Sequence, residues 1–177
     1  MNHVKGYPME RLTNPLTPEY KQLKELVLGS DFAWFYDKNE KDNFHFYSHV
    51  FLDRPEFKKY SVPKSPHIEL FSHVLEQIFE CNNLNASLVY RMNANAVDPQ
   101  PLAPSHTISH VDHDFPHMNM LIYLTDAGGE TVANVAEYHE PIEDDIVIFS
   151  GYHYHKLPET QRRVVLVATY GHTQDWR

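Results

Sequence analysis

The sequence predicts a mainly β domain with helices packed on one face of a sheet. Apolar residues recur at helical spacing only in the first half of the chain, whereas short runs rich in β-branched and aromatic residues follow one another from residue 86 onward. A length of 177 residues fits one domain. We therefore expect a single domain over 1–177, in which 1–84 give helical and aromatic support and 85–171 form a β-sandwich, jelly roll or small barrel.

Two helices are predicted in the first half. Residues 17–28 begin with Thr17 as a suitable N-cap and Pro18 at the first helical position, and Gly29 ends them. The second helix opens at Ser65-Pro66, ends at Asn82-Asn83 and has one apolar stripe, made of Ile68, Leu70, Phe71, Val74, Leu75, Ile78 and Phe79. The aromatic runs at 31–36 and 44–52 predict strands or extended packing segments.

Five strands are predicted in the second half, at 86–92, 117–125, 131–136, 144–149 and 162–170. Turn-forming residues separate them, namely Asp98-Pro99, Ala127-Gly128-Gly129, Glu140-Pro141 and Ser150-Gly151.

Composition excludes several classes of protein. With 15 Lys and Arg against 24 Asp and Glu, the net charge of −9 argues against nucleic acid as the main ligand and mildly favours a neutral or cationic substrate. Since no apolar run approaches about 18 residues and no signal-peptide core follows Met1, we expect neither a membrane span nor secretion. The one cysteine, Cys81, cannot form an intrachain disulfide, which favours a cytoplasmic location.

His110 and Asp112 are the first candidate metal ligands. Residues at i and i+2 of a strand point to the same face, so this pair can bind one ion. Alone, a His-x-Asp pair is equally consistent with a hydrogen-bonded turn, because the chain has 13 histidines.

The second candidate feature is a histidine pair that follows the apolar run 146–149. His153 and His155 share one strand face, so alternation does not separate them. Two histidines and one carboxylate on one side of a metal match the facial triad of non-haem Fe(II) oxygenases, which leaves other positions open. A structural zinc site would instead need four protein ligands that leave no coordination position open.

Arg163 opens the apolar strand 162–170, where an inward charge needs an anionic partner. A bound dicarboxylic acid would supply that partner, with Tyr123 placed to offer its hydroxyl to the same group. Tyr123 can equally be a core aromatic residue, and Arg163 can pair with a surface carboxylate.

Taken in order, these motifs resemble the 2-oxoglutarate- and Fe(II)-dependent oxygenases, and most closely their prolyl-4-hydroxylase-like branch. The matching stretches span about half the chain and are HVD (110–112), IYLTDAGGET (122–131), VIFSGYHYHKLP (147–158) and RRVVLVATY (162–170). The resemblance implies a double-stranded β-helix, or jelly roll, with the N-terminal helices on one sheet.

The resemblance also implies the site. His110, Asp112 and His155 would hold Fe(II), while Arg163 would bind the distal carboxylate of 2-oxoglutarate and Tyr123 would hydrogen-bond the same group. Gly128-Gly129 would make the turn before the strand that begins near Thr131.

Two assignments stay open. His155 is preferred to His153 because it lies six positions after Phe149 (155 − 149) and is followed by Leu157-Pro158. Only eight positions separate His155 from Arg163 (163 − 155), which is short for the family, so Arg162 is kept as a substitute. The segment 93–109 has no clear counterpart, and Asn93 and Asn95 within it are candidate co-substrate contacts.

The implied reaction uses O₂ and 2-oxoglutarate, with ascorbate as a reductant, to hydroxylate an unactivated C–H bond and release succinate and CO₂. The substrate would be a small molecule or peptide, and the sequence predicts no oligomeric state. Two alternatives remain: a cupin-like metalloenzyme that does not use 2-oxoglutarate, for which His153-x-His155 has the right form, and a non-catalytic jelly-roll binding or structural protein.

Overall fold

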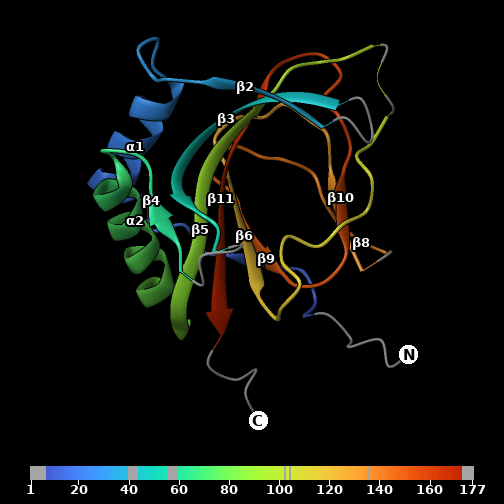
Figure 1. Cartoon of the computed structure of the whole chain (residues 1–177). Helices are drawn as coiled ribbons and strands as arrows, with labels where there is room; N and C mark the ends of the chain where they lie inside the picture. The colour runs from blue at the N-terminus through green and yellow to red at the C-terminus, as the bar shows by residue number, and fades with distance from the viewer. Residues whose placement is uncertain are drawn as a thin grey trace.

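The chain folds into three layers: two helices, a large sheet and a small sheet (Figure 1). The computed structural model describes residues 7–39, 44–55, 60–101, 103, 105–134 and 136–172. Within these residues the eight-stranded sheet has the order β1 (Glu10–Leu12), β9 (Ile146–Phe149), β6 (Met118–Tyr123), β11 (Arg163–His172), β5 (Ala86–Val97), β3 (Phe44–Asp53) and β2 (Phe35–Asn39), with β4 (Val62–Pro63) paired to β3. The described part of the small sheet has the order β10 (His153–His155), β7 (Thr131–Ala133) and β8 (Glu137–His139). All the pairings are antiparallel, and the predicted jelly roll is confirmed.

Both predicted helices are present. Helix α1 (Pro18–Leu28) has Thr17 as its N-cap, whose side-chain oxygen accepts from the Tyr20 backbone N–H at 3.2 Å. Helix α2 (Ile68–Cys81) begins slightly later than the Ser65-Pro66 pair predicts. The reason is local, since the Ser65 hydroxyl is in a turn and accepts from the His67 backbone N–H.

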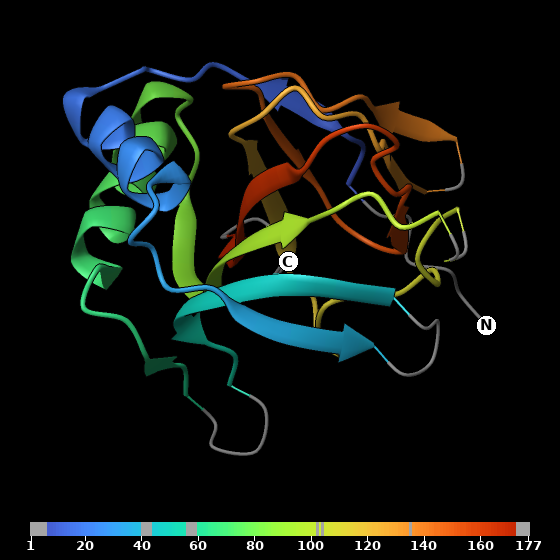
Figure 2. The ribbon, with the colours of Figure 1, turned by 90° about the horizontal axis from the view of Figure 1, so that it is seen from above.

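Side-chain alternation on the central strand β11 divides the interior in two. Leu166, Ala168 and Tyr170 point toward the helices and form a core with residues of both helices, β5 and β6. Val165 and Val167 point the other way, into the space between the sheets, as does Arg163 at the start of the strand. Figure 2 shows the helices on one side and the strands curving around this second space.

The strands differ from the predictions mainly in length. Strand β5 continues to Val97, so the first part of the 93–109 segment belongs to the sheet. Strand β7 stops at Ala133 because Asn134 has a φ of +50°, and β9 starts after Asp144, which has a φ of +69°. Strands β1, β4 and β8 were not predicted, because two or three residues are too few to show a pattern. Strand β10 contains His153 and His155, for which the sequence predicted a shared strand face but no strand bounds.

None of the helices in the described part of the chain is long and apolar enough to cross a membrane. The single cysteine, Cys81, ends α2 as an exposed free thiol.

Candidate active site

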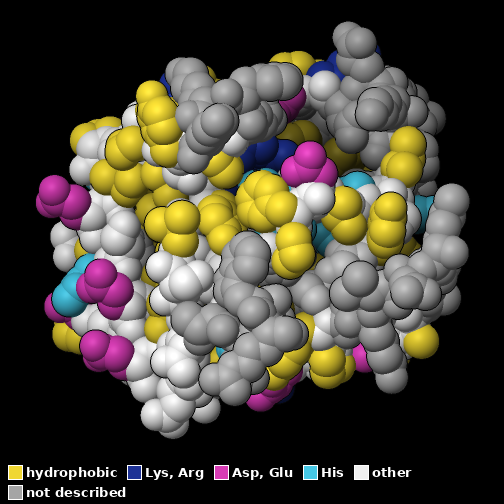
Figure 3. Space-filling view, turned by 60° about the horizontal axis from the view of Figure 1, so that its bottom comes forward, with side chains coloured by type: hydrophobic (Ala, Val, Ile, Leu, Met, Phe, Trp, Pro, Cys, Tyr) yellow, Lys and Arg dark blue, Asp and Glu magenta, His cyan; other side chains and the backbone are white. Residues whose placement is uncertain are grey.

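A cavity of about 440 Å³ lies between the two sheets. Its inner wall consists of inward-facing residues of β5, β6, β9 and β11, while β10 and the segment 107–112 close one side and Phe44 and Phe46 of β3 close another. Figure 3 shows a hollowed face on which Lys or Arg and His side chains lie recessed among hydrophobic ones.

Backbone pairing brings the two histidine motifs together. His110 and His153 exchange both backbone hydrogen bonds, each 2.9 Å from N to O, so the His-x-Asp segment is fixed against β10. On the next inward position of β10, the His155 backbone N–H donates to the Thr107 hydroxyl at 3.0 Å. Two segments about 43 positions apart in sequence therefore pair with each other through a few antiparallel backbone contacts.

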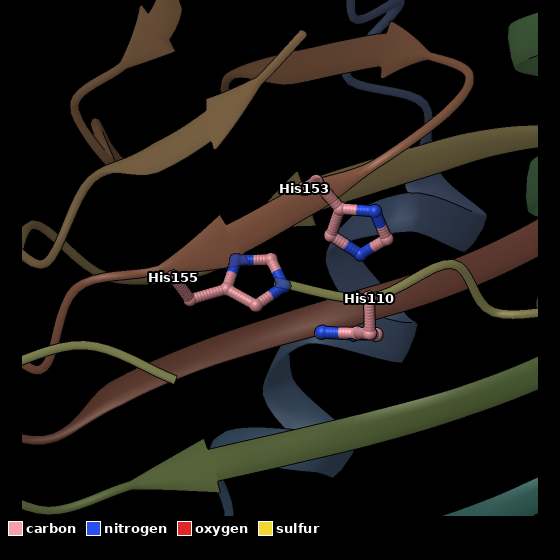
Figure 4. A group of neighbouring side chains, drawn as sticks. All are labelled: His110, His153 and His155. Atoms are coloured by element: carbon pink, nitrogen blue, oxygen red, sulfur yellow. The ribbon is translucent and has the colours of Figure 1, made fainter. Parts of the chain in front are cut away.

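The imidazoles of His110, His153 and His155 form a cluster in the cavity wall. One nitrogen of each ring lies within 4.8 Å of the corresponding nitrogens of the other two. Figure 4 shows a nitrogen of each ring pointing into the space between them. The Nδ1 atoms are engaged elsewhere: those of His110 and His153 contact the carbonyls of Ile108 and Gly151, and that of His155 contacts the Thr131 hydroxyl.

Burial keeps two of these imidazoles neutral. It lowers the pKa of His153 to about 4, against the opposing effect of the Asp112 charge. It also lowers the pKa of His155 well below its ordinary value, and the nearby His153 and Arg163 add to this shift. Neutral imidazole is the form that binds a metal ion.

Asp112 adjoins the cluster and is held by two arginines. Its Oδ2 lies 3.6 Å from Nε2 of His153, while its Oδ1 accepts from Nη1 of Arg91 at 2.7 Å. Nη1 of Arg54 donates to the Asp112 backbone carbonyl at 3.2 Å. Burial by itself would raise the pKa of Asp112, but the neighbouring charges, Arg91 first, hold it far below its usual range. The carboxylate is therefore ionised and directed toward His153.

The residues predicted for the co-substrate lie on the same cavity. Arg163 is 4% exposed, and its Nη1 donates to the carbonyls of Gly129 and Lys156, the latter at 3.0 Å. Its Nε has no hydrogen-bond partner among the described residues. The Tyr123 hydroxyl lies 2.7 Å from that of Thr131, and burial raises the pKa of Tyr123 to about 12.

Gly129 makes this arrangement possible. Its φ of +80° belongs to the left-handed region, as does the φ of +68° at Gly128, so the predicted turn is present. A Cβ at Gly129 would lie 2.9 Å from Nη1 of Arg163 and 2.7 Å from the Lys156 carbonyl oxygen. Only glycine lets the guanidinium approach the turn this closely.

Arg162, the substitute for Arg163, lies outside the cavity. It makes two hydrogen bonds of 2.7 and 2.8 Å to the Asp98 carboxylate on the surface, and its guanidinium lies 5.5 Å from the centre of the Tyr47 ring. Arg163 therefore faces the cavity and Arg162 faces away from it, which is the alternation expected from the sequence.

Several cavity residues escaped the sequence analysis. Arg91 and Arg54 were not singled out, although both line the cavity beside Asp112. Asn119 was missed as well: it lines the cavity at 1% exposure, and neither atom of its amide has a partner in the described part of the chain. Strand alternation could have indicated Asn119, because it lies four positions before Tyr123 on the same strand and therefore points to the same face.

The two asparagines proposed as co-substrate contacts have different places. Asn95 lines the cavity and its Oδ1 accepts from Nδ2 of Asn93 at 2.5 Å. Asn93 is 1% exposed and is not among the lining residues.

Comparison with known proteins identifies the fold. No protein-family model and no curated protein sequence matches the chain. Among solved structures, it is similar to a 2OG-Fe(II) oxygenase family oxidoreductase from Burkholderia pseudomallei, with a TM-score of 0.66 and 16% identity over 86% of this chain and 78% of that one. It is also similar to a prolyl-4-hydroxylase from Pseudomonas putida, with a TM-score of 0.54 and 12% identity over 94% and 93% of the two chains.

A third similar structure is a prolyl hydroxylase from Trichoplax adhaerens in complex with a peptide fragment of the hypoxia inducible factor oxygen degradation domain. Its TM-score is 0.57 and its identity 14%, over 93% of this chain and 84% of that one. The chain therefore has the jelly-roll fold of the 2OG-Fe(II) oxygenases and prolyl-4-hydroxylases.

Proposed function

We propose that the chain is an Fe(II)- and 2-oxoglutarate-dependent dioxygenase that hydroxylates an unactivated C–H bond and releases succinate and CO₂. One observation carries the proposal. Three histidines, two of them kept neutral by burial, and an ionised carboxylate converge on the wall of a cavity that also contains a buried arginine, in the order along the chain that the resemblance implies.

The donor set fits Fe(II). His110, Asp112 and His153 supply two imidazoles and one carboxylate, which is the facial set of non-haem Fe(II) oxygenases. The carbonyls of Ile108 and Gly151 accept from Nδ1 of the two histidines, so the lone pair of each ring is at Nε2. We choose His153 for this triad because Asp112 lies beside its Nε2 and because it pairs with His110 along the backbone. It also lies ten positions before Arg163 (163 − 153) rather than eight.

Arg163 and Tyr123 would bind the co-substrate. A buried guanidinium whose described contacts are carbonyls still needs an anion, and burial lowers its pKa. The distal carboxylate of 2-oxoglutarate would supply that charge, and the Tyr123 hydroxyl and the Asn119 amide lie on the same wall. When bound, Fe(II) and 2-oxoglutarate supply the O₂ chemistry. The protein would hold the metal ligands and orient the two substrates in the cavity.

The charged residues that line the cavity are Arg54, Arg91, Arg163 and Asp112. Arg91 is paired with Asp112, and Arg163 would bind the co-substrate, so both charges already have an anionic partner in this proposal. The substrate we propose is a small molecule or a peptide. The exposed Cys81 thiol supports a reducing, cytoplasmic compartment.

The test begins with protein purified without oxygen. Addition of Fe(II) and then 2-oxoglutarate should produce the weak visible charge-transfer band of the chelate, and admitting O₂ should release succinate. Arg163→Ala should lose the band at low 2-oxoglutarate concentration, whereas Arg162→Ala, a matched change one position away, should keep it. Absence of both band and succinate from iron-loaded, folded protein would refute the proposal.

A second candidate is a cupin-like metalloenzyme, favoured by the third imidazole in the cluster. It would bind a divalent metal yet show no band or succinate with 2-oxoglutarate. A binding module would show no metal affinity at all.

A further inference from the structure

When His110, Asp112 and His153 are assigned as the metal-binding triad, His155 is the member of the histidine cluster that has no assigned role. Its ring is nevertheless directed at the same point, with the nitrogens of the three rings within 4.8 Å of one another (Figure 4). Neighbouring nitrogens of an octahedral ion are about 3.0 Å apart when each is bound at about 2.1 Å. The ring nitrogens, at up to 4.8 Å from one another, must therefore come closer by as much as about 1.8 Å per pair, or roughly 1 Å for each ring, to share one ion.

His155 differs from the other two in how its Nδ1 is held. The carbonyls beside His110 and His153 can only accept, so they fix one tautomer. The Thr131 hydroxyl, 2.8 Å from Nδ1 of His155, can donate or accept. His155 is therefore satisfied both with a lone pair at Nε2, which binds a metal, and with an N–H there, which donates to an anion.

His155 also lies between the metal cluster and the anion site. His155, Tyr123 and Arg163 line the same cavity, and the Thr131 hydroxyl bridges His155 to Tyr123. A molecule that reaches from the metal to Arg163 must therefore pass beside or replace this imidazole.

We propose that His155 is a fourth, exchangeable ligand of the metal: it coordinates while the co-substrate position is empty and leaves when a chelating 2-oxo acid enters. The inference rests on the proposed triad. An octahedral ion with four protein ligands keeps two positions, whereas a chelating acid and O₂ together need three. His155 is the ligand whose release costs least, because Thr131 satisfies both of its tautomers.

The experiment counts imidazoles. The full chain is loaded with one equivalent of Cu(II), and pulsed EPR detects the remote ring nitrogen of each coordinated histidine. We expect three imidazoles in the wild type, falling to two when 2-oxoglutarate is added. His155→Val should give two under both conditions, and His155→Gln is a second variant in case the first does not fold.

Thr131→Val and Thr131→Ser form a matched pair. Valine removes the hydroxyl and should lower Cu(II) affinity by roughly tenfold, as loss of a partner behind a ligand does, while serine keeps the wild-type value. His73→Asn, on the exposed side of α2, is the control and should keep all three imidazoles.

Two results would overturn the inference: two imidazoles in the wild type without 2-oxoglutarate, or three that persist after it is added. The succinate assay separates this inference from the proposed function. Succinate release with only two imidazoles at rest refutes the fourth ligand alone. Three imidazoles at rest, with neither succinate nor a charge-transfer band, refute the proposed function and with it the exchange.

Discussion

Nη1 of Arg91 lies 2.7 Å from Oδ1 of Asp112, so Arg91 holds the carboxylate of the candidate metal centre in place. Both side chains are largely buried, with exposed fractions of 17% and 10%. The pair couples the site to the central sheet, because Arg91 belongs to β5.

Asp112→Ala should therefore remove metal binding and also destabilise the fold. Removing one partner leaves Arg91 buried without its carboxylate, which costs about 3 kcal/mol. Urea denaturation of the metal-free protein measures this cost. The double variant Arg91→Met/Asp112→Ala should recover part of it, and equal stabilities of Asp112→Ala and wild type would contradict the role given to the pair.

The metal-free protein should lose stability as the pH falls from about 6.5 to 4. His153 has a pKa of about 4 in the folded chain and about 6.5 when unfolded, so in this interval the unfolded state binds the extra proton. The difference corresponds to at most about 3 kcal/mol. Below pH 4 the depressed pKa of Asp112 extends the loss. Thermal melts should show a shallower slope for His153→Asn and an unchanged one for His73→Asn.

Arg163→Ala should weaken 2-oxoglutarate binding by about 2–5 kcal/mol, the usual cost of truncating one partner of a buried charge pair. Titration of the iron-loaded protein without oxygen measures the affinity. Arg162→Ala should leave that affinity unchanged and cost at most about 1 kcal/mol of stability, because its pair with Asp98 is exposed. The opposite result for the two variants would move the anion site to the surface.

A bound divalent metal should raise the melting temperature. At a free concentration of 100 Kd the gain is about 2.7 kcal/mol, or roughly 5–10 °C for a domain of this size. Mn(II), which is stable in air, is a convenient probe, and His110→Ala should abolish the shift. A shift that persists in His110→Ala would place the metal elsewhere.

The sequence predicts which way Arg163 and Tyr123 face, but it does not rank His153 and His155 as metal ligands. Arg163 and Tyr123 stand in apolar strands with a clear period of two, so their faces follow from their neighbours. His153 and His155 also obey that period, and for this reason it cannot rank them. Their ranking depends on the pairing of His110 with His153, a contact between segments far apart in sequence that no local pattern encodes.

Arg91 illustrates the same limit. It lies 21 positions before Asp112, on a strand whose extent beyond residue 92 was underestimated, and its partner is fixed by the register of the whole sheet. The helices, in contrast, were predicted closely because Thr17, Pro18 and the apolar stripe of α2 are local signals.

The turn at Gly129 has a consequence for how this fold can diversify. One missing side chain leaves the opening through which Arg163 reaches its position. A single added methyl group would obstruct that opening while leaving every charged residue and every metal ligand in the sequence intact. A descendant of this protein could therefore lose the observed position of the Arg163 guanidinium through a change that a comparison of its polar residues would not detect.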